Sequence, residues 1–148
     1  MILISACLCG VNCKYSGGNN INEKTMKLFE DGKAILVCPE QLGGLTTPRV
    51  PSEIVGGTGV EVLAGKAQVI TKDGVNVTDQ FIKGAEETLA IAKTVKAEYA
   101  ILKSKSPSCG TGIIYAGTFK GDIRFGDGVT SATLKKHGFK VITENDIV

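Results

Sequence analysis

The stretch ILISACLCG, residues 2–10, decides the predicted fold, because a short apolar run ends abruptly in a loop with glycine and two cysteines. A run of this length, bounded by such a loop, is typical of a buried strand. Three similar apolar runs follow at residues 34–38, 99–103 and 139–143. We therefore expect four buried strands spread along the chain.

Helical patterns separate these strands. In residues 19–33, Asn22 is a suitable N-cap before an amphipathic segment, and a longer helix is expected from Thr78 onward. A short helix is expected at residues 129–138. Alternation of this kind predicts an α/β protein with a mostly parallel, doubly wound sheet of the Rossmann or flavodoxin type and right-handed crossovers.

Two segments depart from the alternation and are predicted as β-hairpin insertions, residues 59–71 and 113–128. Residues 39–53 hold three of the four prolines and are predicted as a loop. No repeat, low-complexity tract or linker divides the sequence. We expect one domain that covers residues 1–148.

Composition argues against several classes of function. The net charge is +2, aromatic residues make up 5% and Trp is absent, so neither a nucleic-acid surface nor a base-stacking platform is expected. No apolar stretch approaches the roughly 18 residues of a membrane span. The number of cysteines is five, which is odd and fits a complete set of disulfides poorly. The first residues lack the positive charge of a signal peptide, so we expect reduced thiols in the cytoplasm.

Cysteines accompany three of the four predicted strands. Cys7 comes just after the first run, Cys38 ends the second, and Cys109 lies six residues after the third. The carboxyl ends of parallel strands open on one edge of a sheet, where such folds bind ligands. We therefore expect these three thiols to converge on one site.

Polar side chains stand beside two of these thiols. Glu40 lies two residues after Cys38 in CPE, and Ser106 and Ser108 precede Cys109 in SPSCG. Ser108 is a candidate substrate contact. A single buried cysteine is most simply a small core residue, but three at three strand ends favour a shared site.

Spacing alone leaves three kinds of cysteine chemistry open. Structural zinc usually takes cysteines two to four residues apart, and the only close spacings are C-x-C and C-x3-C within residues 7–13, so zinc would need Cys38 or Cys109 as well. An iron–sulfur cluster on three thiolates leaves one iron exposed as a Lewis acid. A thiol-redox module would instead use the cysteines of residues 7–13.

Other candidate sites are weaker. A phosphatase-type nucleophile is excluded, because its loop needs an arginine six residues after the cysteine and none precedes Arg49. Arg49, in TTPRVPSE, is either a substrate contact that reaches a ligand carbonyl or, as is commoner, a solvated arginine of a loop. The stretch GDGVTS, residues 126–131, either binds an anion or is a capped turn. His137, the only histidine, stands at the C-terminal end of a predicted helix. A favourable interaction with the helix dipole is a sufficient reason for a histidine at this position.

Five blocks of the sequence resemble one protein family. They are SACLCGVNCKYSGG (5–18), CPEQLGGLTTPRVPSEI (38–54), TKDGVNVTDQFIKGAEE (71–87), AILKSKSPSCGTG (100–112) and GDGVTSATLKKHG (126–138). In this order, over almost the whole chain, they are similar to the bacterial and archaeal domain-of-unknown-function family 523. The characterised member of that family is thiouracil desulfurase.

The resemblance implies a 4Fe–4S cluster held by Cys7, Cys38 and Cys109. One iron of this cluster has no protein ligand, and the cluster is easily lost in air. It implies that Glu40 is the acid/base residue and that Ser106 assists proton delivery. The implied reaction is a non-redox, hydrolytic desulfidation of a thiolated nucleobase such as 2-thiouracil, from C=S to C=O, that releases sulfide. The expected partner is a small thio-compound, with neither nucleic acid nor membrane involved.

Three positions depart from the family pattern. Cys9, Lys14 and Ser16 stand where the family usually has Leu, Arg and Asp, so Cys9 is not counted as a ligand. Cys13 matches a frequent family cysteine and is an alternative ligand or a resolving thiol.

Overall fold

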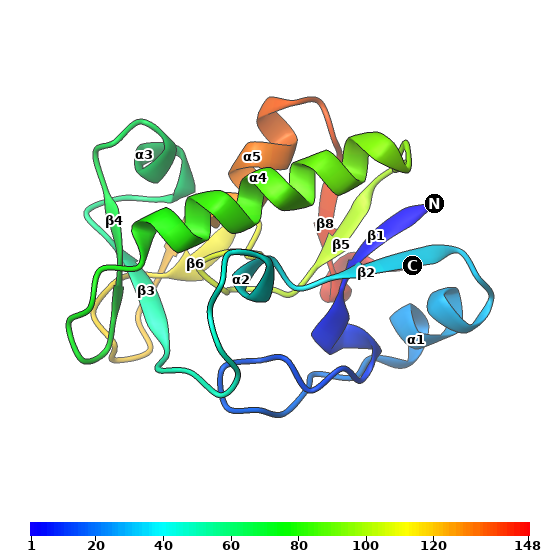
Figure 1. Cartoon of the computed structure of the whole chain (residues 1–148), viewed down its shortest axis with the longest axis horizontal. Coiled ribbons are helices and arrows are strands. Elements are labelled where there is room, and N and C mark those ends of the chain that lie inside the picture. Colours follow the sequence, from blue (N-terminus) through cyan, green and yellow to red (C-terminus); the bar gives the residue numbers. More distant parts are fainter.

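A four-stranded parallel sheet forms the centre of the protein in the computed structural model, which describes residues 1–148 (Figure 1). Its strands are β1 (Ile2–Ser5), β2 (Ala34–Val37), β5 (Ala100–Leu102) and β8 (Val141–Thr143), in the order β2-β1-β5-β8. The register places Ile4 beside Leu36 on one side and Ile101 on the other. All four predicted strands are confirmed.

Helices cover both faces of this sheet (Figure 1). The helix α1 (Glu23–Glu30) lies on one face, and α4 (Thr78–Thr94) and α5 (Val129–Lys136) lie on the other. Successive side chains of a strand point to opposite faces. Accordingly Ile4 packs in a core cluster with Met26 of α1, whereas Leu3 packs in another with Leu89 and Leu134. The predicted doubly wound α/β fold is confirmed.

Local signals explain where the first helix begins. The side chain of Asn22 accepts hydrogen bonds from the backbone N–H groups of Lys24 and Thr25, as the predicted N-cap should. In α4, which is the helix expected from Thr78 onward, the buried positions include Phe81 and Ala85, four residues apart on one face. No helix of the protein combines the length and apolarity needed to cross a membrane.

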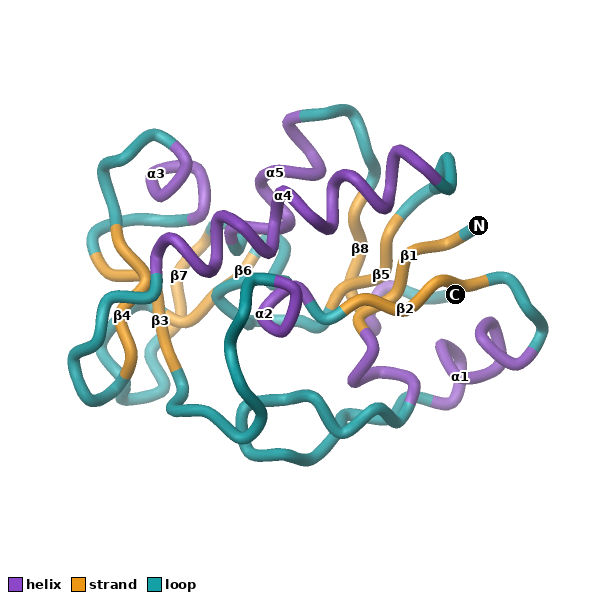
Figure 2. The backbone as a smooth tube through the Cα atoms, viewed as in Figure 1, coloured by secondary structure: helices purple, strands orange, loops and turns teal.

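The remaining elements lie beside the main sheet (Figure 2). They are the strands β3 (Ser52–Val55), β4 (Gln68–Thr71), β6 (Ile113–Tyr115) and β7 (Ile123–Phe125), the helices α2 (Pro39–Leu42) and α3 (Gly59–Leu63), and the 3-10 turns η1 (Ala6–Cys9) and η2 (Glu144–Asp146). Strands β6 and β7 form an antiparallel pair, which confirms the predicted hairpin at residues 113–128.

The predicted hairpin at residues 59–71 is wrong. Strand β4 pairs with β3, which begins at the end of the predicted loop, and residues 59–63 form the helix α3 between them. The alternating valines of this short segment fit either structure. A capping box decides for the helix, because Thr58 and Glu61 exchange hydrogen bonds at its start.

The short helix α2 also lies in the predicted loop, and two glycines place it against α4. A β-carbon at Gly84 of α4 would collide with the carbonyl of Pro39, and one at Gly43 would collide with the carbonyl of Gln80. The two backbones therefore approach more closely than any larger residue permits. This contact positions the residues at the carboxyl end of β2.

Candidate active site

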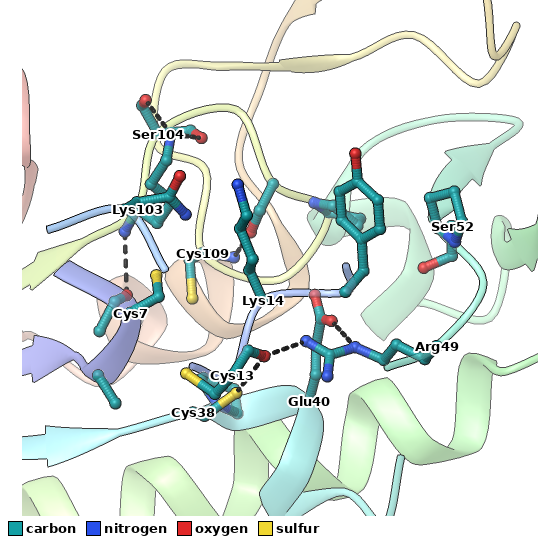
Figure 3. A pocket seen from close by; sticks show the side chains of 18 of the residues that line it. Cys7, Cys13, Lys14, Cys38, Glu40, Arg49, Ser52, Lys103, Ser104 and Cys109 are labelled. Carbon is teal, nitrogen blue, oxygen red and sulfur yellow. Dashed lines mark hydrogen bonds and ion pairs between the residues drawn. The ribbon is translucent and has the colours of Figure 1, made fainter. Parts of the chain in front are cut away.

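The carboxyl edge of the parallel sheet opens into a pocket of about 400 Å³ (Figure 3). Cys7 lies in η1 directly after β1, Cys38 caps α2 directly after β2, and Cys109 lies in the loop that follows β5. All three line the pocket, together with Cys13. Figure 3 shows their four sulfurs facing the same part of the pocket. The structure thus brings together thiols that are far apart in the sequence.

Cys13 is the fourth thiol of the pocket and is only 2% exposed. Its carbonyl oxygen lies 3.8 Å from the Sγ of Cys38. Cys9, by contrast, does not line the pocket. Its thiol hydrogen bonds to the carbonyl of Thr25, under α1, at 3.5 Å. Cys9 is therefore a packing residue, whereas Cys13 belongs to the pocket.

Hydrogen bonds between the thiols divide them into donors and acceptors. A hydrogen bond from Cys13 lowers the pKa of Cys7 to about 7 against the opposing effect of burial. The same donor lowers the pKa of Cys38 to about 7. Donation to Cys38 and Cys7 raises the pKa of Cys13. Because Cys13 carries a single S–H, it can donate to only one of these two thiolates at a time, so one of them ionises readily near neutral pH, as a metal ligand does.

Burial raises the pKa of Cys109 to about 12 and outweighs a hydrogen bond from Ser5. The negative charges of Cys7, Glu40 and Cys38 act in the same direction. A metal centre reverses this balance, because a coordinating thiol is deprotonated outright. The buried position of Cys109 thus favours the neutral thiol, and a thiolate is stable there only when a metal cation binds to it.

The loop of Cys109 is held by its own serines and by α5. The N–H of Cys109 donates to Ser106 Oγ at 2.7 Å, and its carbonyl accepts from Ser131 Oγ at 2.8 Å. At the start of α5, the N–H groups of Val129 and Thr130 donate to the carbonyls of residues 107 and 108. The GDGVTS segment is therefore a turn that packs against the Cys109 loop. These N–H groups donate to carbonyls of the protein and are not open to an anion.

The two serines of SPSCG point to different places. Ser106 lines the pocket, but Ser108 is 1% exposed, lies outside the pocket lining and hydrogen bonds to Thr130 Oγ1 at 2.7 Å. Likewise His137 lies outside the pocket, and its Nδ1 is 2.9 Å from the carbonyl of Thr133. The structure does not bring Ser108, a predicted substrate contact, to the pocket.

Glu40 and Arg49 form the principal ion pair of the pocket. Arg49 Nε donates to Glu40 Oε2 at 2.6 Å, and the side chains are only 9% and 16% exposed, respectively. Nη2 of Arg49 donates to the Cys13 carbonyl at 2.8 Å. The guanidinium, predicted to reach a ligand carbonyl, is instead bound to the protein itself (Figure 3).

The comparisons with known proteins agree with this geometry. A family model described as 2-thiouracil desulfurase matches residues 2–146. The chain belongs to this family. It is 51% identical over 147 residues to the uncharacterized protein YbbK of Bacillus subtilis (strain 168), a match that covers 99% of the chain and 97% of YbbK. The expected family and enzyme class are confirmed: the protein is an enzyme of the desulfurase type.

A solved structure carries the likeness further. It is the 4Fe–4S-dependent thiouracil desulfidase TudS, with a TM-score of 0.86 and 38% sequence identity. The match covers 99% of this chain and 91% of the TudS chain. The fold of the desulfurase family therefore extends over the whole protein.

The donor set of this desulfurase-family pocket fits an iron–sulfur cluster. Four cysteines line it, histidine contributes nothing, and soft thiolates are the ligands that such clusters take. No three His, Cys, Asp or Glu side chains form the tight group that one metal ion needs. The lining of the pocket thus supplies sulfur ligands rather than imidazole.

Several pocket residues escaped the sequence analysis. Lys103 and Ser104 line the pocket directly after β5, Tyr15 lines it from a loop, and Tyr115 lines it from the last position of β6. Lys103 Nζ pairs with Glu144 at 3.2 Å, which joins the ends of β5 and β8. The position of Lys103 immediately after an apolar strand was the available signal, since that edge of the sheet was already predicted to hold the site.

Proposed function

We propose that this protein removes sulfur from a small thiolated pyrimidine such as 2-thiouracil, with a 4Fe–4S cluster held by Cys7, Cys38 and Cys109. The net reaction exchanges C=S and water for C=O and hydrogen sulfide, so no electron donor or acceptor is consumed. Membership of the 2-thiouracil desulfurase family and the likeness to TudS support the chemistry.

The observation that carries the proposal is one pocket onto which thiols, a carboxylate and a hydroxyl open together. When bound, the cluster supplies a Lewis-acidic iron without a protein thiolate, which polarises the thiocarbonyl. The pocket of about 400 Å³ is within the usual range for small-molecule sites. A free base or similar compound, rather than a nucleic acid, is accordingly the proposed substrate.

Glu40 is the proposed general base. Its Oε2 is occupied by Arg49, whereas its Oε1 has no hydrogen-bond partner in the protein. The free oxygen faces a partly buried pocket, where it accepts a proton from the water that attacks the thiocarbonyl carbon. Since the carboxylate is fixed by its ion pair, it keeps this orientation without the help of the substrate.

Ser106 is the proposed proton donor. Its Oγ accepts a hydrogen bond from the Cys109 N–H, so its own O–H remains free to donate toward the pocket. A hydroxyl in this position delivers a proton to the ring or to the departing sulfur.

All five cysteines are unpaired, which supports a reducing compartment, and we propose the cytoplasm.

The test is an anaerobic assay after reconstitution with iron and sulfide. The purified protein is expected to turn brown and to convert 2-thiouracil into uracil and sulfide in equal amounts without added reductant. In ¹⁸O-labelled water the uracil should gain one labelled oxygen. The Cys38→Ala variant should lose both colour and activity, whereas the matched Cys9→Ala variant should keep them.

A colourless protein that holds stoichiometric zinc after anaerobic handling would favour the alternative of a zinc-binding module. Reversible disulfide formation without bound metal would favour the thiol-redox alternative. Either result, combined with no uracil formation, would remove the desulfidase proposal.

A further inference from the structure

Arg49 binds four groups of the protein and holds three chain segments together. Besides Glu40 Oε2 at 2.6 Å and the Cys13 carbonyl at 2.8 Å, its guanidinium donates to Thr47 Oγ1 at 2.9 Å and to the Thr46 carbonyl at 3.2 Å. Its backbone N–H donates to the carbonyl of Tyr15 at 2.8 Å. With a side chain only 9% exposed, Arg49 has little surface left for a ligand.

The donor count shows how fully this guanidinium is used. An arginine side chain carries five N–H donors in a rigid fork. In Arg49 the four acceptors above occupy Nε, both hydrogens of Nη1 and one of Nη2. Only one Nη2 hydrogen is left, so a substrate that took two hydrogen bonds from this group would have to displace a protein partner.

The carboxylate of Glu40 has the complementary arrangement. The residue sits in the four-residue helix α2, one position after Pro39, and no other cation of the protein is within ion-pair distance of it. Without Arg49, only the side-chain torsions of Glu40 would set the direction of Oε1. The ion pair fixes Oε2 against the TTPR segment and thereby fixes where Oε1 points.

We propose that Arg49 is a positioning residue that orients the Glu40 carboxylate for proton abstraction and does not itself contact the substrate. The inference rests on the proposed function, because it acts through the base assigned there. The same guanidinium ties the Cys13 carbonyl to the carboxylate, so the thiol-bearing loop and the base keep a constant relation to each other.

A double-substitution cycle in the reconstituted enzyme tests this role. Glu40→Gln should lower kcat by about 100-fold or more, as the loss of a general base does. Arg49→Met should lower kcat by about tenfold or more because the carboxylate is misplaced. In the Glu40→Gln background, however, Arg49→Met should change kcat less than about twofold, since the group that it positions is already inactive.

Three further measurements separate positioning from general structural support. Arg49→Met should keep the iron content, and it should bind the product uracil, measured by calorimetry, with unchanged affinity. Added guanidinium ion at millimolar concentration should restore part of kcat in Arg49→Ala but not in the double variant with Glu40→Gln. Arg124→Met, at the only other arginine and exposed on β7, is the matched control and should behave as the wild type.

The outcomes are distinct. Equal losses from Arg49→Met in both backgrounds, or a loss of iron or of uracil binding, would overturn the positioning role while the proposed function stands. Full activity of Glu40→Gln would remove both the base assigned to Glu40 and the role of Arg49. If Arg49→Met does not fold, Arg49→Lys keeps the charge but loses the fork, and an undiminished kcat in that variant would overturn the proposal.

Discussion

At the scale of residues, two cysteines that are close in the sequence have different fates. Gly10 ends η1 with a φ of 85°, a left-handed conformation that glycine adopts without strain, and the chain reverses there. Cys9, before the reversal, faces α1, whereas Cys13, after it, faces the pocket. The spacing C-x3-C therefore does not describe a local metal motif, because only one of its two thiols lines the pocket.

This arrangement predicts which cysteines carry the cluster. Serine substitution of Cys7, Cys38 or Cys109 should abolish iron binding, because each removes one of the three proposed ligands. Cys13→Ser should retain the iron, since the proposed ligand set is complete without it, and Cys9→Ser should do the same.

The measurement is the iron and acid-labile sulfide content of each variant after the same anaerobic reconstitution. Circular dichroism of the cluster-free variants controls for folding. A Cys13→Ser variant as depleted of iron as Cys38→Ser would make Cys13 a ligand and contradict the assignment of three.

At the scale of elements, the contact between α2 and α4 holds the proposed base and one proposed ligand in place. Helix α2 is preceded by Cys38 as its N-cap and contains Glu40, yet it has only four residues and cannot be stable by itself. It depends on α4, against which Gly43 and Gly84 allow an unusually close approach. The long, rigid α4 thus supports the site without contributing a side chain to the pocket.

Replacement of Gly84 by alanine tests this support. Helix propensity alone would stabilise the protein by about 1 kcal/mol. Because the new β-carbon would collide with the Pro39 carbonyl, we expect a loss of about 1–3 kcal/mol instead, together with lower iron retention. Urea unfolding and iron analysis measure the two effects.

Glu86→Ala, an exposed position in the same helix, is the matched control and should change stability by less than about 0.5 kcal/mol. A more stable Gly84→Ala variant that keeps its iron would show that α2 adapts to the larger residue and that the close contact is dispensable.

At the scale of the whole molecule, the sequence predicts what depends on local pattern and fails where distant partners decide. The four parallel strands follow from apolar runs, and the common edge of Cys7, Cys38 and Cys109 follows from topology. The pairing of β3 with β4 does not, because an intervening helix separates the partners. The inward direction of Ser108 also escapes prediction, since its partner Thr130 lies on another element.

The same topology would make binding of the proposed cluster a property of the whole fold. The three proposed ligands follow three different strands, so a bound cluster connects segments that separate on unfolding. A ligand that binds only the folded state stabilises it. We therefore expect the free energy of unfolding of the cluster-loaded protein to be about 2–4 kcal/mol higher than that of the cluster-free protein. For a chain of this size, that corresponds to a rise in Tm of roughly 4–16 °C.

Anaerobic thermal and urea unfolding of the two forms measures this difference. Cys9→Ser should show the same stability difference between the two forms as the wild type. Cys38→Ser should show no difference, because this variant is expected to bind no cluster after reconstitution. If the loaded and cluster-free proteins unfold together, the cluster is bound by one segment alone. The convergence of three strand ends would then have no energetic role in holding it.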